Sequence, residues 1–462
     1  LEDGVVLTFQ DIRNGDNDVF AYKISAEGEF IWGEDGIELS TGPAFYAAPK
    51  ICVSASNNTI VAWQADEVVI LQKISPGGDK LWGDNGITLS GSNTFSWPQL
   101  LPVGLDDVIL KYFEDSGVIW APTRHVYARR FDADGNTAWA DDAIISNAGG
   151  ISAWTQVFPF INDGEDGFFI AWHDDRDGDN HSSTFVQHIS ADGEVLLGDN
   201  GTEASIQPNR HNFYPQLALP SGSEDIFVYW NEMDTDQNNR GIYGQKISSS
   251  GERQWTDNGK VFIELSSTNV YPFAASQSGE DMIVFYEKYS DVINAGISAM
   301  AIDADGEFAW PQQMAELCSV LSEKVHPVAG NFMMGQWVTA WEDNRNGNRD
   351  IYAQNIQLDG SLGPITAGEV VVHPDTLFFE ENPQTLQVTV VNNTLEPYTL
   401  HEVDESGEWW HVTPYPAFPY EIAAGDSLVM DVYFEYNGSK QVNGYTYDTL
   451  NMIATPDTHR LV

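Results

Sequence analysis

The sequence predicts an all-β protein, a seven-bladed β-propeller followed by an Ig-like β-sandwich. Three observations carry this prediction. A strand-rich unit recurs through residues 1–365, its copies are spaced almost evenly, and a different strand pattern replaces it in residues 366–462. We therefore expect two domains, 1–365 and 366–462.

The clearest copy of the unit is WEDNRNGNRDIYAQNI, residues 341–356. An apolar run ends in an aromatic residue, a polar loop rich in Asn, Gly and Arg follows, and a second run closes on Tyr-Ala-Gln-x-Ile. The same arrangement occupies residues 9–24 and 172–189. Weaker copies begin at Trp63, Tyr112, Trp230 and Tyr286. Alternating apolar runs bounded by turn residues are typical of short strands.

The last apolar residue of each copy gives the period. These residues are Ile24, Ile74, Phe131, Ile189, Ile247, Ile302 and Ile356, at spacings of 50, 57, 58, 58, 55 and 54. That period holds four strands of about five or six residues with their turns, which favours propeller blades over a helical solenoid. The first copy lacks its innermost strand and the last lacks its outer run, so six blades is the alternative.

After the closing residue, each copy continues with a tight turn, as in SAEGEFIW (25–32) and SADGEVLL (190–197). This turn resembles the Asp-box of sialidase-type propellers, in which an acid caps a turn and an aromatic wedges between sheets. The resemblance implies that the aromatic residue belongs to the core.

The innermost strand of the next copy then follows, usually opened by a proline. These prolines are Pro49, Pro98, Pro215, Pro272 and Pro327. A proline at the first residue of a strand costs no ladder hydrogen bond, so we expect each of them at the start of its strand.

Residues 366–462 read as further strands at sandwich spacing. HPDTLFF (373–379), VNN (391–393) and IAAGDS (422–427) resemble the ASPM/SPD-2/Hydin-like Ig family. The resemblance implies a spacer or adhesion module with no catalytic residue. The whole chain resembles secreted repeat-rich β-propeller proteins of Bacteroidetes-type bacteria, which implies an extracellular or cell-surface location and membership of a longer polypeptide or assembly.

Charge excludes some partners. The chain carries 21 Lys and Arg against 69 Asp and Glu, a net charge of −48. Such a surface repels nucleic acid and anionic lipid, and no apolar run is long enough to insert into a bilayer. Cys52 and Cys318 are too few for a disulfide framework.

The loop of the repeat carries an acid and an arginine two residues apart, and the simplest role of that pair is to tie down the loop. Calcium is the alternative, because carboxylates recur at alternate positions and hard cations prefer several oxygen ligands. The candidate ligands are Asp16, Asp18, Asp175, Asp177 and Asp179. Their spacing does not match an EF-hand, so only a different type of calcium loop is open.

Aromatic residues precede several of the innermost strands. Loops that enter these strands share one face of a propeller, where ligands usually bind. The candidate ligand-binding residues are Tyr46, Trp97, Trp120, Trp154, Arg210, Tyr214 and Tyr271. Packing of the same rings between blades is the competing interpretation.

No hydrolase, zinc-protease, P-loop or dinucleotide motif occurs in the sequence. We therefore expect a non-enzymatic protein in which the propeller binds or displays a glycan or protein partner and the Ig-like domain is a spacer. A sialidase-like propeller glycoside hydrolase is one alternative, for which the sequence identifies no catalytic residue. An architectural module of a larger surface assembly is the other.

Overall fold

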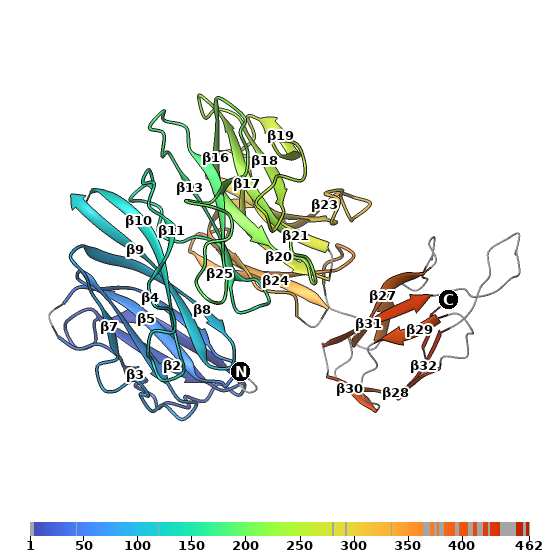
Figure 1. The fold of residues 1–462 in the computed structure, drawn as a ribbon, viewed down its shortest axis with the longest axis horizontal. Coiled ribbons are helices and arrows are strands. Elements are labelled where there is room, and N and C mark those ends of the chain that lie inside the picture. The colour runs from blue at the N-terminus through green and yellow to red at the C-terminus, as the bar shows by residue number, and fades with distance from the viewer. Residues whose placement is uncertain are drawn as a thin grey trace, which may run out of the picture. The chain divides into compact units, whose positions relative to one another are not determined.

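The structure is a computed structural model. It describes residues 4–42, 44–118, 120–279, 281–291, 293–333, 335–363, 370–373, 377, 383–392, 397–404, 410–413, 419–423, 426–434, 450–455 and 459–461. These residues form β-strands joined by turns, with no helix among them (Figure 1). In this part of the chain, no helical segment has the length and apolar character needed to span a membrane. The predicted all-β class is confirmed.

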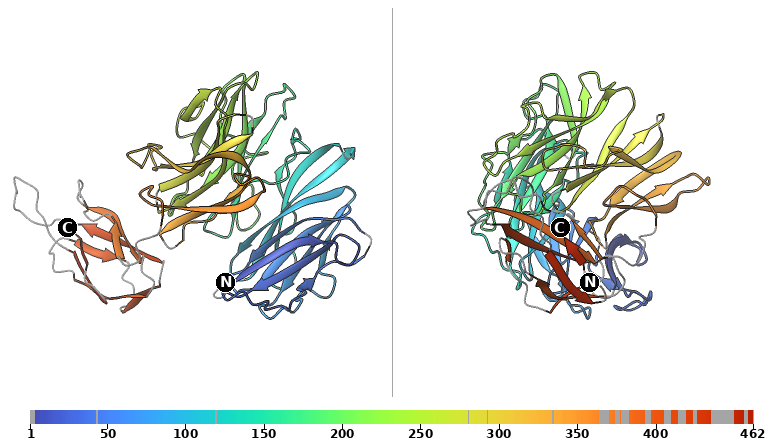
Figure 2. Two further views of the ribbon diagram at one scale, coloured as in Figure 1. Left: turned by 180° about the vertical axis from the view of Figure 1, so that it is seen from behind. Right: turned by 90° about the vertical axis from the view of Figure 1, so that its right-hand side faces the viewer.

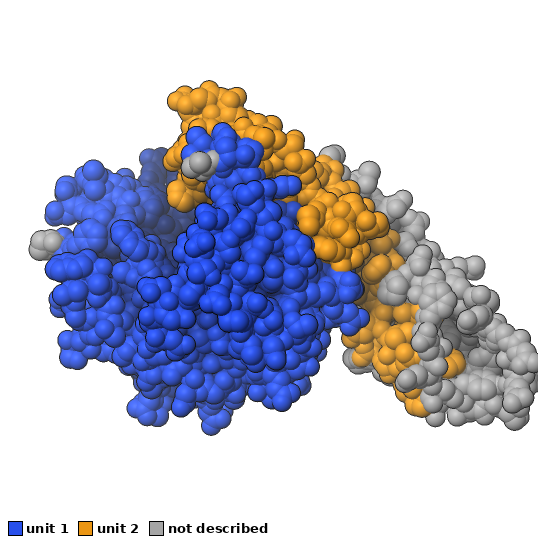
Figure 3. Space-filling view, turned by 90° about the horizontal axis from the view of Figure 1, so that it is seen from above, with its two compact units in different colours: residues 1–295, 302–307 blue, residues 296–301, 308–462 orange. Residues whose placement is uncertain are grey.

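The chain divides into two compact units (Figure 3). The first comprises residues 1–295 and 302–307, and the second comprises residues 296–301 and 308–462. The division falls within one strand, β22 (Asn294–Ile302). The predicted domain boundary between residues 365 and 366 lies outside the described residues.

The first five repeats each form a separate antiparallel sheet in which sequence neighbours pair. The strands of the first sheet are β1 (Val5–Asp11), β2 (Asp18–Ile24) and β3 (Ile37–Glu38). The second sheet has β4 (Tyr46–Val53), β5 (Thr59–Ala65), β6 (Val68–Ile74) and β7 (Ile87–Leu89). The third has β8 (Thr94–Val103), β9 (Asp107–Val118), β10 (Ala121–Phe131) and β11 (Ala143–Ser146). The fourth has β12 (Phe160–Asn162), β13 (Phe168–Asp174), β14 (Ser183–Ile189) and β15 (Thr202–Glu203). The fifth has β16 (Arg210–Ala218), β17 (Ile226–Asp234), β18 (Arg240–Ile247) and β19 (Lys260–Ser266).

The last two repeats share one long strand. The strand order is β20-β21-β22-β23-β24-β25, and β23 runs for 16 residues. The bounds are β20 (Val270–Ser278), β21 (Asp281–Tyr289), β23 (Met314–Ala329), β24 (Gln336–Asp343) and β25 (Asp350–Gln357). The C-terminal half of β23 pairs with β24, so the outer strand of one repeat continues into the inner strand of the next. Within the described residues, the first repeat has three strands, as predicted. The number of blades stays a prediction.

The C-terminal segment forms two four-stranded sheets, ordered β26-β27-β31-β29 and β30-β28-β32-β33 (Figure 2). The bounds are β26 (Val370–His373), β27 (Gln384–Asn392), β28 (Tyr398–Asp404), β29 (Trp410–Thr413), β30 (Tyr420–Ile422), β31 (Ser427–Phe434), β32 (Leu450–Thr455) and β33 (His459–Leu461). Val388 and Met430 of one sheet share a buried core with Leu400 and Ile422 of the other. This arrangement is a β-sandwich, and its Ig-like assignment stays a prediction.

Apolar cores lie between successive repeat sheets. Ile60 and Leu71 of the second sheet pack with Val108 and Leu110 of the third in one buried cluster. Similar clusters join the first sheet to the second, the third to the fourth and the fourth to the fifth. A repeat that cannot bury both faces alone gains stability from its neighbours, as the sequence period predicts.

The tight turns after the third strands confirm the structural role that the Asp-box resemblance implies. Trp139 is 7% exposed and its indole N–H donates to the carbonyl of Ala191 in the next turn at 2.8 Å. Gly193 of that turn has φ +85°, and a Cβ there would lie 2.8 Å from the Trp139 ring. Trp32, Trp82 and Trp310 donate in the same way. The aromatic residue therefore links consecutive repeats.

The predicted acid–arginine pairs also stabilise their loops. Arg176 donates to Asp174 through Nε at 2.8 Å and through Nη2 at 2.7 Å. Arg13 pairs with Asp11 and Arg345 with Asp343 in the same way. The loop interpretation is confirmed at all three positions.

The prolines of the inner strands lie inside the strands, not at their first residues. Pro49, Pro98 and Pro215 each lie within a β-bulge at which the register shifts. The prediction that they open their strands is wrong. An edge strand that bulges already leaves an N–H out of the ladder, so proline costs no hydrogen bond there.

Candidate functional site

The residue before each of these prolines adopts an unusual backbone conformation. Ala48, Trp97 and Tyr214 have φ values of +52°, +48° and +54°. The left-handed conformation costs a non-glycine residue roughly 1–2 kcal/mol. In β16 the bulge lies between Phe213 and Gln216, and it leaves the Tyr214 side chain 52% exposed. Bulges of this kind redirect a side chain, and the structure retains this one despite its cost.

Tyr214 lies at the centre of a group of aromatic rings. Its ring centroid is 5.7 Å from that of His173, 5.9 Å from that of Phe213 and 6.2 Å from that of Tyr271. His211 stacks on Phe213 at 5.4 Å. We call these five residues the Tyr214 surface. It joins the end of β13, the start of β16 and the start of β20.

The strand pattern explains why His173 points toward Tyr214. Trp172 is fully buried in the core between the third and fourth sheets, so the next side chain along β13 leaves the opposite face of the strand. The equivalent residue two sheets earlier, Gln64, accepts a hydrogen bond from the Trp97 N–H at 3.4 Å. Asn231, its equivalent in the fifth sheet, donates to the Val270 carbonyl at 2.6 Å. The position after the aromatic residue thus contacts the inner strand of the next repeat.

The two histidines of the Tyr214 surface are neutral at pH 7. Burial lowers the pKa of His173 to about 4. Burial is also the main reason why the pKa of His211 lies below its ordinary value. His173 is 8% exposed, and its Nδ1 has no hydrogen-bond partner within the described part of the protein. The centre of the surface is therefore aromatic and uncharged.

A buried carboxylate lies on β17, opposite Asn212 of β16. Glu232 is 1% exposed and accepts hydrogen bonds from Asn212 at 2.6 Å and from the Trp230 indole at 2.7 Å. Arg210 Nε lies 3.6 Å from its other carboxylate oxygen. Burial outweighs these contacts and raises the pKa of Glu232 to about 7.

A second arginine lies beside Tyr271. The Arg240 guanidinium is 5.6 Å from the centre of the Tyr271 ring, and its Nη1 donates to Asn269 Oδ1 at 2.8 Å. Tyr271 also contacts Tyr289 edge-on at 5.6 Å. Aromatic faces with hydrogen-bonding groups at their rim are typical of small-ligand sites.

The structure separates the aromatic residues that the sequence predicts as ligand contacts. It brings Tyr214 and Tyr271 together, with Arg210 on the same strand as Tyr214. Tyr46 is only 6% exposed and lies in a core, where its hydroxyl donates to the Thr41 carbonyl at 2.9 Å. Trp97 packs partly buried against another core.

The two remaining predicted contacts are the most exposed tryptophans among those whose burial the structure describes. Trp120 is 80% exposed and Trp154 is 89% exposed. Trp120 lies on the hairpin tip between β9 and β10, and Trp154 lies on the loop between β11 and β12. Ligand binding by these seven residues stays a prediction.

Sequence reasoning did not identify His173 or Glu232 as members of the site. The available signal was their place in the repeat, one and two residues after the aromatic that ends the second strand. This position can be linked to a site only when the structure shows that it faces the inner strand of the next repeat.

The predicted calcium ligands do not converge. Asp179 Oδ1 accepts from the His181 N–H at 2.8 Å, and Asp175 Oδ2 accepts from the Asn180 N–H at 3.2 Å. Asp177 and Asp16 are exposed, whereas Asp18 is buried. Within the described ranges, no three His, Cys, Asp or Glu side chains form a group that could hold a metal ion. Calcium binding stays a prediction.

No protein-family model and no curated protein sequence matches the chain. Several solved structures show a distant likeness. The Penicillium chrysogenum α-L-arabinanase complexed with arabinobiose is 12% identical over 68% of this chain and 93% of its own, with a TM-score of 0.36. The Clostridium thermocellum α-L-arabinofuranosidase is 14% identical over 58% and 91%, with a TM-score of 0.32. Prolyl oligopeptidase B from Galerina marginata is 10% identical over 84% and 50%, with a TM-score of 0.40. At these scores the fold assignment rests on the strand order described above, and no activity follows from the likeness.

Proposed function

We propose that the chain is a non-enzymatic extracellular or cell-surface protein that binds a neutral glycan at the Tyr214 surface. The observation that carries the proposal is the half-exposed Tyr214 ring, which a strained bulge places against His173 and Tyr271. The same bulge recurs at Ala48 and Trp97, so the exposure of the Tyr214 ring beside other aromatic rings, and not the backbone strain, is what supports binding.

Charge and chemistry select the ligand class. A protein with a net charge of −48 repels anionic polymers, so phosphate-rich and acidic partners are disfavoured. The centre of the surface is uncharged, because the pKa values of both histidines are lowered. Flat aromatic faces stack on the C–H faces of sugar rings, while Arg210 and Arg240 at the rim can donate hydrogen bonds to hydroxyl groups.

Glycan binding can be tested by calorimetry with a panel of neutral oligosaccharides. Tyr214→Ala is expected to weaken binding about tenfold, the equivalent of ~1.4 kcal/mol for one lost ring contact. Phe30→Ala is the matched control. Phe30 has a similar exposure of 48%, and it pairs with Ile24 at the C-terminal end of β2, whereas Tyr214 lies near the N-terminal end of β16. Equal affinities for Tyr214→Ala and the wild type would contradict the proposal.

A glycoside hydrolase is the second candidate, and one observation favours it. Glu232 has a pKa of about 7, so at neutral pH about half of the molecules carry a proton there that a general acid could donate. Two observations favour a structural role for Glu232 over a catalytic one. It is only 1% exposed, and it accepts hydrogen bonds from Asn212 and Trp230. A hydrolysis screen of the same oligosaccharides separates the two candidates. Product release by the wild type that Glu232→Gln abolishes would favour the enzyme.

A further inference from the structure

The third repeat carries an unusually long hairpin. Its strands β9 and β10 have 12 and 11 residues, whereas the corresponding strands of the other four-stranded repeat sheets have seven to nine. In both Figure 1 and Figure 2 the hairpin reaches beyond the neighbouring strands of its unit. Trp120 lies at the tip, between the paired residues Val118 and Ala121, and is 80% exposed.

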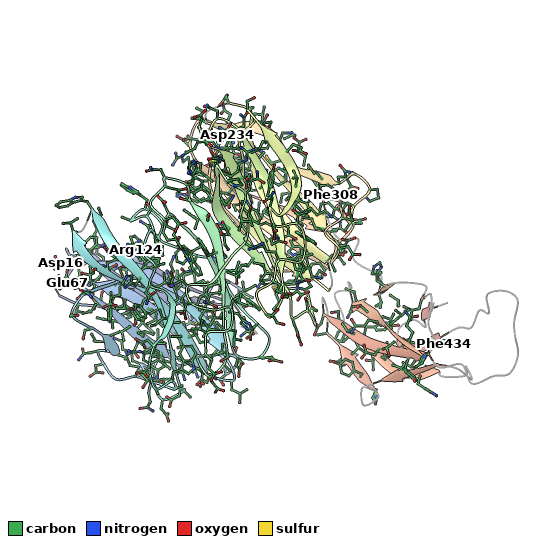
Figure 4. All side chains as sticks on the ribbon, turned by 45° about the horizontal axis from the view of Figure 1, so that its top comes forward. Asp16, Glu67, Arg124, Asp234, Phe308 and Phe434 are labelled. Carbon is green, nitrogen blue, oxygen red and sulfur yellow. The ribbon has the colours of Figure 1, made fainter. Side chains whose placement is uncertain are left out.

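A buried arginine fixes a second segment to this hairpin. Arg124, labelled in Figure 4, is 3% exposed and forms a two-bond ion pair with Asp115 at 2.7 and 2.8 Å. Its remaining nitrogen donates to the Thr155 carbonyl at 2.8 Å and lies 3.4 Å from the carbonyls of Ser152 and Ala153. The loop that carries Trp154 is therefore held from within by one guanidinium group.

The same loop is anchored on both sides of this contact. The Gly150 carbonyl accepts from the Asp175 N–H at 3.1 Å. Gln99 exchanges two hydrogen bonds, at 2.8 and 2.9 Å, with the backbone of Phe158. Yet Trp154, between these anchors, is 89% exposed. Because the backbone of the loop is already fixed, a ligand that stacks on the ring has to order only the two side-chain torsions of Trp154.

We propose that Trp120 and Trp154 form a second carbohydrate-binding surface, which takes a neutral glycan chain longer than a single sugar. Along the hairpin, Arg124 and its partner Asp115 lie three residues from Ala121 and Val118, the last paired residues before the tip. At about 3.4 Å per residue, the tip is about 10 Å from Arg124. Arg124 thus joins the two segments that carry the rings, and a chain of several sugars is long enough to contact both.

Area and charge disfavour other occupants. Each tryptophan can bury at most about 250 Å². Two rings therefore provide less than the roughly 800 Å² per partner of a stable protein interface. A second copy of this chain would also bring another net charge of −48 to the contact.

The test is calorimetric titration with a neutral polysaccharide and with its short oligosaccharides. Trp120→Ala and Trp154→Ala are each expected to weaken polysaccharide binding about tenfold and to leave short-chain binding at the Tyr214 surface unchanged. Phe45→Ala, which removes another ring that is 64% exposed, is expected to change neither. Thermal melting checks that each variant is folded.

The same titrations separate a failure of this inference from a failure of the proposal for the Tyr214 surface. If Tyr214→Ala keeps its affinity for polysaccharide while the tryptophan variants lose it, the second surface stands without the first. Wild-type affinity for polysaccharide in both tryptophan variants would overturn the inference. So would a wild-type dimer in sedimentation that Trp120→Ala dissociates, because the rings would then form a protein interface.

Discussion

Asp343 shows how one carboxylate stabilises a repeat when it is fully buried. It accepts hydrogen bonds from Ser322, Trp341 and Arg345, and Lys324 Nζ lies 3.2 Å away. Burial opposes ionisation, but the hydrogen bonds from Arg345, Ser322 and Trp341 outweigh it and hold the pKa of Asp343 far below its ordinary value. Its contribution to stability is therefore present above about pH 4 and is lost as the pH falls below that value.

Asp343→Asn is expected to lower the free energy of unfolding by about 3–5 kcal/mol, because the buried Lys324 and the partly buried Arg345 lose their counter-charge. Asp11→Asn is the matched control. Asp11 forms the same pair with Arg13, but both side chains are about a quarter to a third exposed, so water replaces the lost contact. Urea unfolding of both variants at pH 7 measures the difference. Similar losses would show that burial of Asp343 does not decide the effect.

Glu232 should oppose folding as the pH rises. Its folded pKa of about 7 lies above the ordinary value of 4.5, so between these two pH values the unfolded chain ionises while the native chain keeps its proton. Stability therefore falls with increasing pH across this window. A shift of this size corresponds to about 3 kcal/mol at most.

Glu232→Gln removes that penalty. The free energy of unfolding of the variant, relative to the wild type, is expected to be higher at pH 8 than at pH 4.5. Urea titrations at the two pH values measure this difference. An unchanged difference would show that Glu232 ionises normally in the folded protein.

The turn that links two repeats depends on close contact between elements. Gly193 and Gly198 both have a positive φ, at +85° and +82°. A Cβ on Gly193 would lie 2.8 Å from the Trp139 ring, whereas a Cβ on Gly198 would meet nothing within 4 Å. Both positions therefore need a residue that tolerates a positive φ, but only at Gly193 is there no room for a side chain.

Gly193→Ala is expected to destabilise the protein by about 2–3 kcal/mol, since it adds a clash to the cost of the left-handed conformation. Gly198→Ala should cost about 1 kcal/mol, the conformational part alone. Thermal or urea unfolding of the pair gives the contribution of the turn–Trp139 contact. Equal losses would mean that this contact can relax freely.

The sequence predicted some residues of the candidate site, but not how they are arranged in space. Tyr214 and Tyr271 could be placed near the starts of inner strands, because the repeat register fixes their position along the chain. Trp97 has the same register as Tyr214, directly before a proline, and packs against a core. Whether such a ring faces solvent depends on the local bulge and on the neighbouring sheet, and neither follows from the spacing.

At the scale of the whole molecule, charge is the dominant feature. A net charge of −48 repels itself across the surface, and salt screens this repulsion over about 10 Å at 0.1 M. The melting temperature is therefore expected to rise as NaCl increases from 10 to about 500 mM. Calorimetry in buffers of matched pH measures this rise. A flat response would show that the charges are spread too far apart to destabilise the fold.

Calcium can be tested in the same experiment. A specific site predicts a larger rise with CaCl₂ than with MgCl₂ at equal ionic strength, because Ca²⁺ binds only the native state. Asp175→Asn with Asp177→Asn should remove that excess. Equal curves for the two salts would remove the calcium interpretation of these loops.

The sequence by itself determined the repeat, the strands within it and the residues that hold each turn and loop. These features depend on local patterns: alternation along a strand, glycine at a turn, and an acid two residues from an arginine. Only the tertiary structure decided that Pro215 lies within a bulge, that Tyr214 is exposed, and that His173 and Tyr271 lie beside it. Such contacts join residues from different sheets, and a one-residue shift in register changes which side chains meet.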